Sequence, residues 1–267
     1  MSRLGALYKS TLGKKFIVAL TGIVMIGFLI GHVAGNLKVF LPPVDGGPGV
    51  GLQPDIDYYA HFLRKIGDPF LPHMAFLWFA RLVLLGSLIL HVICVMQLST
   101  ANSAARQVDY ASRKFARATP PARWMMYTGC FLLFFIAVHL LHLTVGVFGS
   151  GFEHGKVYQN LHGSFSNILW VSFYVVSIAI VALHLYHGVW SLFQTLGLDN
   201  PDRNRGLRRL AAVLSVVLFA GFIAVPTAFL TGIAKTPDEV VSGEVAGRDV
   251  GDGSDEQVHK NNNEEQE

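Results

Sequence analysis

An apolar stretch in the middle of this chain carries two pairs of histidines. Residues 131–190 read FLLFFIAVHLLHLTVGVFGSGFEHGKVYQNLHGSFSNILWVSFYVVSIAIVALHLYHGVW. Two more histidines lie singly inside other apolar runs, which brings the set to His32, His91, His139, His142, His184 and His187. An ionisable side chain at bilayer depth costs about 2.5 kcal/mol or more on insertion scales. Histidines in four separate apolar runs therefore indicate a function that needs them.

The composition is too apolar for an ordinary soluble domain. Of the 267 residues, 52% are hydrophobic and 15% are charged, and the mean hydropathy is +0.43. Five runs without Asp or Glu, each long enough for the roughly 20 helical residues that cross a hydrocarbon core, explain this. They are residues 16–39, 73–99, 124–149, 165–196 and 207–234. The sequence therefore predicts an all-α integral membrane bundle of five transmembrane helices over residues 16–235.

The segments at the two ends and the basic loops predict the orientation. Most of the 21 Lys and Arg residues fall in the lead 1–15 and in loops 100–123 and 197–209. By the positive-inside rule, the N-terminus is expected in the cytoplasm and the C-terminus outside. The tail, residues 236–267, is polar and is expected to be disordered. The basic loops could dock a soluble protein partner, and no nucleic acid partner is expected.

The helical rise places the histidines at two heights. Counted from the cytoplasmic ends, His32 lies about 24 Å in and His139 about 22 Å, whereas His91 lies about 14 Å in and His184 about 18 Å. Height alone leaves the histidine one turn further along as an alternative in the third and fourth spans. Each layer offers one imidazole from each of two helices. A haem iron with an imidazole on both faces has no open position for substrate, so the pattern predicts two electron-carrying haems.

Other chemistries fit this pattern less well. A zinc or copper site would need its ligands at one height. A cytochrome b of the bc type spaces two histidines about two heptads apart on one helix, whereas the same-helix pairs here are three residues apart. A transporter would be expected to carry midplane acids or broken spans. A single buried histidine is more often a packing residue, so a histidine-lined permease stays open as a rival.

Glycines at four-residue spacing mark the first span. They are Gly27, Gly31 and Gly35. Such a stripe lets another group approach the helix backbone closely. The sequence leaves open whether that group is a helix or a flat cofactor.

Five groups of residues, in order, resemble one known family. They are 20–22 with 31–37 (LTG, GHVAGNL), 59–65 (YAHFLRK), 90–92 (LHV), 137–144 (AVHLLHLT) and 183–191 (LHLYHGVWS). In these segments, over roughly residues 8–235, the chain resembles the cytochrome b subunit of succinate dehydrogenase and fumarate reductase, in its five-helix, two-haem form.

This resemblance implies the ligands and the partners. His32 and His139 would be the axial ligands of an outer (distal) haem b, and His91 and His184 those of an inner (proximal) haem b. The histidines one turn beyond a ligand would support or pack beside it; these are His142 and His187. A flavoprotein with covalently bound FAD and an iron–sulfur subunit are implied on the cytoplasmic side of a bacterial inner membrane.

The chain would then pass electrons between the iron–sulfur subunit and membrane quinone, expected to be menaquinone, without itself acting on succinate. A haem b subunit of another quinone-linked oxidoreductase, such as nitrate reductase, is the alternative. Tyr58, His61 and Arg64, in an amphipathic segment that predicts a surface helix, are the quinone candidates because they would lie at the outer interface. Arg81 could pair with a haem propionate or extend to the membrane surface.

Overall fold

Five long helices dominate the computed structural model, which describes residues 8, 10–47, 49–104, 120–148, 151–198 and 200–242, and of 120–123 the backbone alone. The helices are α2 (Thr11–Asn36), α4 (Ala75–Ala104), α5 (Pro120–Leu140), α7 (Ile168–Thr195) and α8 (Pro201–Leu230). All five are long and apolar enough to cross a membrane. This confirms the predicted all-α membrane bundle, and the chain is a multi-pass membrane protein.

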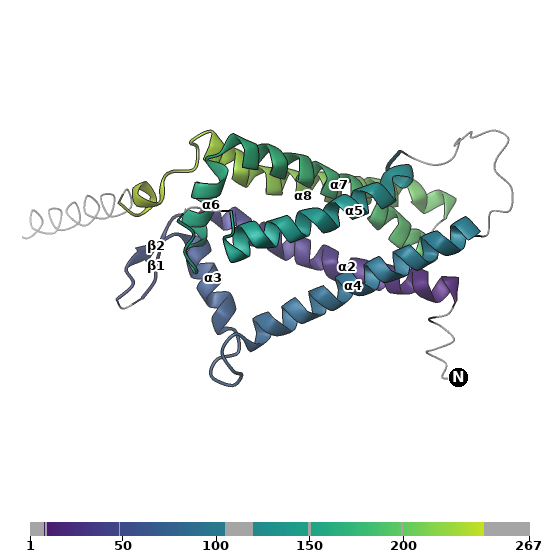
Figure 1. The fold of residues 1–267 in the computed structure, drawn as a ribbon, viewed down its shortest axis with the longest axis horizontal. Helices are drawn as coiled ribbons and strands as arrows, with labels where there is room; N and C mark the ends of the chain where they lie inside the picture. Colours follow the sequence, from purple (N-terminus) through teal and green to yellow (C-terminus); the bar gives the residue numbers. More distant parts are fainter. Residues whose placement is uncertain are drawn as a thin grey trace, which may run out of the picture.

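The long helices pack in an uneven bundle (Figure 1). α7 packs along α8 on one side and along α5 on the other, and α2 packs on α4, α8 and α7. α4 meets the bundle chiefly through α2. The buried apolar side chains accordingly gather where α7 and α8 meet α2 and the short helix α6 (Val157–Phe165).

Short elements gather at the end of the bundle that lies on the left in Figure 1. They are the 3₁₀ turn η1 (Leu37–Phe40), strands β1 (Val44–Asp45) and β2 (Leu52–Gln53), and helices α3 (Asp55–Lys65) and α6. β1 and β2 pair antiparallel, with Val44 opposite Gln53. α3 confirms that this segment is a short helix, and its position on the membrane surface stays a prediction. The strand pair and α6 are elements that the apolar runs do not predict.

Side-chain caps determine where the long helices begin. Ser10 Oγ accepts a hydrogen bond from the Gly13 amide at 2.9 Å, and Asn167 Oδ1 accepts one from the Leu169 amide at 2.9 Å. Each cap satisfies an amide of the first turn that has no partner inside the helix. α2 therefore begins at Thr11, five residues before the first apolar run, so the last residues of the segment 1–15 are helical.

The fifth helix begins earlier than the sequence predicts. Asn200 Oδ1 accepts a hydrogen bond from the Asp202 amide at 3.0 Å, and Pro201 occupies the first turn, where its missing N–H costs nothing. The prediction that 197–209 is all loop is therefore wrong. Its basic residues lie on the first turns of α8, where Arg208 stacks over the Trp190 ring at 4.5 Å.

Two contacts tie α3 to the end of α2 and to the turn η1 that follows it. A β-carbon placed on Gly35 would lie 2.8 Å from Tyr59 Cε1, so a ring from α3 occupies the space that a side chain there would need. Lys38 Nζ lies 2.8 Å from Asp55 Oδ2. Of the predicted glycine stripe, Gly35 is thus approached by an aromatic ring, while Gly27 and Gly31 would admit a β-carbon without meeting another atom within 4 Å.

The predicted tail is partly ordered. Residues 237–242 are helical, and Val240 packs against the buried cluster that includes Tyr158 and Phe229. This apolar contact holds a segment that the polar composition alone predicts to be disordered. Residues 243–267, and residues 105–119 of the second basic loop, lie outside the described part of the chain.

Candidate functional site

Two of the predicted ligands meet between the first and third spans. The ring centroids of His32 on α2 and His139 on α5 lie 6.0 Å apart, and the ring planes are at 89°. Phe28 stacks on His32 with centroids 5.1 Å apart, and Phe222 of α8 lies 5.7 Å away. Of the two histidines that the sequence leaves as alternatives in the third span, His139 is therefore the one whose ring faces His32.

His142 has a different neighbourhood, although it follows His139 by three residues. Its ring stacks on Trp170 with centroids 3.8 Å apart and planes at 24°, and its side chain is only 1% exposed. The Tyr174 hydroxyl lies 3.2 Å from His142 Nδ1 and 3.4 Å from His139 Nδ1. The Tyr174 hydroxyl thus lies beside both histidines of this span, and His142 packs against Trp170.

A local change of helix geometry accompanies this arrangement. α5 ends at Leu140 and continues as the π-helical turn η2 (Leu141–Val145), which carries His142. The turn stops at Gly146, whose φ of +81° suits glycine. A β-carbon there would also meet the Phe152 ring. Single π turns inside α-helices recur at functional sites.

The second pair of predicted ligands is held from two other helices. His91 of α4 has its Nδ1 3.1 Å from Thr21 Oγ1 of α2. His184 of α7 has its Nδ1 3.1 Å from Thr128 Oγ1 of α5. Both imidazoles are half-buried. The structure therefore holds one histidine of the second span and one of the fourth, each beside a threonine of a neighbouring helix.

The His184 ring also lies against the backbone of α5. A β-carbon added at Gly129 would lie 3.6 Å from His184 Cε1, which is ordinary van der Waals contact. His187 lies one turn further along α7 and is half-buried.

The donor set can be compared with the needs of different metals. Within the described residues, no three His, Cys, Asp or Glu side chains are grouped so as to hold a metal ion. Zinc needs three or four protein ligands, which a pair of imidazoles does not provide. A haem supplies four ligands from its own ring and needs only two more. Two imidazoles on opposite sides of one metal have centroids roughly 6 Å apart at ordinary metal–nitrogen distances, and the spacing of His32 and His139 fits this. The spacing of His32 and His139 therefore fits the two protein ligands that a haem needs.

Arg81 lies near the outer end of α4. It is exposed, and its guanidinium lies 5.1 Å from the centroid of the Trp78 ring. This cation–π contact fits an interfacial position. Pairing with a propionate stays a prediction.

The three quinone candidates lie on α3 but do not share one cavity. His61 lines a cavity of about 420 Å³ at the outer end, together with Asp57, His154, Lys156 and Tyr158. The residues that line it include neither Tyr58, which is 45% exposed, nor Arg64, whose Nη1 donates to the Ala60 carbonyl at 2.7 Å. Of the three, His61 is therefore the one that lines this cavity.

Asp57 gives this cavity a buried carboxylate. Its Oδ1 accepts a hydrogen bond from the Tyr158 amide at 2.9 Å, in the first turn of α6. Burial raises the pKa of Asp57 above its ordinary value of 3.8, and the backbone N–H groups of Tyr158 and Val157 oppose that rise. Asp57 thus anchors α6 to α3.

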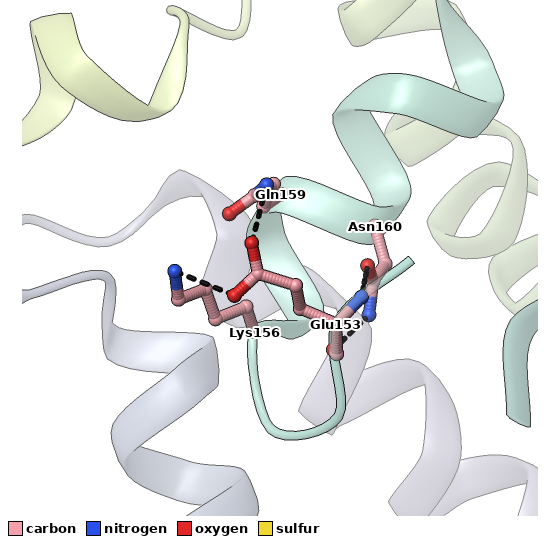
Figure 2. Close-up of polar contacts among 4 residues, drawn as sticks. All are labelled: Glu153, Lys156, Gln159 and Asn160. Carbon is pink, nitrogen blue, oxygen red and sulfur yellow. Dashed lines mark hydrogen bonds and ion pairs between the residues drawn. The ribbon is translucent and has the colours of Figure 1, made fainter. Parts of the chain in front are cut away.

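Polar contacts also hold the turn that leads into α6. Figure 2 shows Glu153 at their centre. Its Oε2 lies 2.7 Å from Lys156 Nζ, and its amide donates to Asn160 Oδ1 at 3.0 Å. The hydrogen bond and charge of Lys156 lower the pKa of Glu153 below its ordinary value of 4.5. This turn delivers Lys156 and Tyr158 to the wall of the outer cavity.

The sequence analysis assigns no role to four residues at the candidate site: Thr21, Thr128, Tyr174 and Asp57. A threonine inside a membrane helix commonly bonds its own backbone, and a lone tyrosine reads as core, so neither carries a local signal. The partner of Asp57 lies 101 residues away. Only the packed helices reveal these contacts.

Comparison of the chain with protein-family models, with curated proteins and with solved structures finds no match.

Proposed function

We propose that this protein is the di-haem cytochrome b membrane anchor of a succinate:quinone oxidoreductase, either a succinate dehydrogenase or a fumarate reductase. Its role is to pass electrons between an iron–sulfur subunit and membrane quinone. The observation that supports this best is the facing of His32 and His139 from two helices at a centroid distance of 6.0 Å. The resemblance of the histidine-bearing segments to that family supports the particular complex.

Each pair of histidines has a defined task. His32 and His139 hold the outer haem b, and His91 and His184 hold the inner one. Haem b supplies a one-electron couple that needs no open coordination position. Around His32, the rings of Phe28 and Phe222 keep water away from the imidazole.

The basic residues support the orientation, and the resemblance to the family implies the partners. The N-terminus lies in the cytoplasm of a bacterial cell, and the protein spans its inner membrane. The FAD-bearing flavoprotein and the iron–sulfur subunit dock at the end of the bundle where α8 begins, and the positive-inside rule places the basic residues of 100–123 on the same side. That end carries Arg203, Arg205, Arg208 and Arg209, which suit an acidic partner surface.

Quinone, proposed to be menaquinone, reacts in this subunit. His61 is the best of the three candidates because it lines the outer cavity beside Asp57 and Lys156. Tyr58 and Arg64 lie on the same helix and are the two weaker candidates.

Purification of the complex from native membranes tests the proposal. The reduced protein is expected to show a b-type absorbance with two haem b per chain, and to copurify with a flavin-bearing subunit. Absence of a reduced b-type band would overturn the haem assignment and favour a permease. Haem without a flavoprotein would favour another quinone-linked oxidoreductase, such as one of the nitrate reductase type.

A further inference from the structure

The two histidines of the inner pair each have a threonine hydroxyl beside Nδ1, and those of the outer pair, among the residues that the structure describes, do not. His91 and His184 each place Nδ1 3.1 Å from a threonine hydroxyl, and each threonine lies on a neighbouring helix. Thr21 supports His91 from α2, and Thr128 supports His184 from α5. The outer pair instead involves the phenol of Tyr174.

Each hydroxyl proton is already committed to the backbone. Thr21 Oγ1 lies 2.8 Å from the Ile17 carbonyl oxygen, and Thr128 Oγ1 lies 3.0 Å from the Met125 carbonyl oxygen. A carbonyl oxygen can only accept, whereas an imidazole nitrogen can donate or accept. The hydroxyl therefore donates to the carbonyl, and its oxygen is left to accept from the imidazole.

The tautomer of both rings follows from this. A neutral imidazole has one N–H, and in His91 and His184 it must lie at Nδ1 to be donated to the threonine. Nε2 is then the unprotonated nitrogen, with its lone pair free. This is the state that an imidazole needs in order to bind a metal through Nε2.

We propose that Thr21 and Thr128 are positioning residues that select the Nδ1–H tautomer of His91 and His184 and tune the inner haem through them. The redox part of this inference rests on the proposed function, but the tautomer part does not. Donation from Nδ1–H makes the imidazole a stronger ligand. A stronger ligand favours the ferric state, so the two hydroxyls lower the midpoint potential of the inner haem.

Redox titration of the purified complex tests the tuning. In Thr21→Val and Thr128→Val, the inner haem should shift to a higher midpoint potential while the outer haem stays unchanged, and Thr→Ser variants should restore the wild-type value. A tenfold change in the ferric-to-ferrous preference appears as about 59 mV for one electron. An unchanged inner potential in both valine variants would overturn the tuning.

A matched control separates tuning from simple destabilisation. Thr227 of α8 bonds its own backbone as Thr21 does, with Oγ1 2.7 Å from the Ile223 carbonyl oxygen, but it supports no histidine. Thr227→Val should leave both potentials unchanged. If it shifts the inner potential as much as Thr21→Val does, the effect belongs to the helix and not to the imidazole.

Nitrogen-15 NMR of the full chain, labelled at the histidine nitrogens and kept reduced, tests the tautomer whether or not haem is present. His91 and His184 should show a protonated Nδ1, and the valine variants should lose that preference. A haem-free protein with protonated Nδ1 would refute the proposed function and leave the tautomer intact. Protonated Nε2 in the wild-type chain would overturn this inference even in a haem-containing protein.

Discussion

Replacing Tyr174 with phenylalanine would remove the one hydroxyl that two histidines share. Tyr174 is 4% exposed, and His142 is 1% exposed. The Tyr174 hydroxyl is 3.2 Å from His142 Nδ1, while His142 Nε2 is buried without a hydrogen-bond partner. In Tyr174→Phe, both ring nitrogens of His142 would be buried and unsatisfied.

The size of the loss follows from the cost of an unsatisfied polar group. Leaving a buried nitrogen without its partner costs about 1–3 kcal/mol. Each kcal/mol lowers the melting temperature of a chain of this size by about 2–4 °C. We therefore expect Tyr174→Phe to melt about 4–8 °C below wild type, taking about 2 kcal/mol as the loss. Thermal unfolding in detergent, followed by circular dichroism, measures this.

Two further variants test the reason for the loss. Tyr127→Phe removes a phenol hydroxyl from a side chain that is 69% exposed, and it should melt as wild type does. His142→Phe keeps a ring against Trp170 and removes both unsatisfied nitrogens. The double variant with Tyr174→Phe should therefore recover much of the lost stability. A Tyr174→Phe protein as stable as wild type, or a double variant with strictly additive losses, would refute the reasoning.

Three more variants concern α2 and α3. Gly35→Ala places a β-carbon 2.8 Å from Tyr59 Cε1, so it should destabilise the protein by about 1–3 kcal/mol in thermal unfolding. Gly31→Ala meets nothing within 4 Å and should be neutral or slightly stabilising, and a reversal of this order would contradict the assigned contact. Burial raises the pKa of Asp57 above 3.8 in the folded protein, so the protonated carboxyl stabilises the fold. This contribution to stability is lost as the pH rises from 3.8 through the raised pKa. Asp57→Asn, which can still accept from the Tyr158 amide, should therefore gain stability relative to wild type from pH 4 to neutral pH; a constant difference across that range would contradict this.

The helix number and the bundle class are predictable from composition because each span must be long and uninterrupted by charge. The helix starts are less predictable because capping residues, not apolar residues, determine them. α8 begins at the Asn200 cap, two turns before the run that starts at Leu207, so basic residues assigned to a loop lie on a helix. Local cap signals of this kind are present in the sequence and outweigh the hydropathy pattern at helix ends.

The candidate site is likewise predictable from the sequence only in part. The helical rise alone places His32 and His139 at similar heights, but it cannot choose between His139 and His142, since helix boundaries are uncertain by several residues. Rotation about the helix axis makes that choice: His139 faces His32, while His142 faces Trp170. The supporting hydroxyl of Tyr174 depends on how α5 and α7 pack, which no local pattern encodes.

Low-temperature absorbance spectra of reduced membranes from His32→Ala and His139→Ala strains test the central claim most directly. If both imidazoles hold the same haem, the two variants should lose the same b-type component and keep the other one. Loss of different components in the two variants, or retention of both components in either, would contradict the pairing of these helices on one haem.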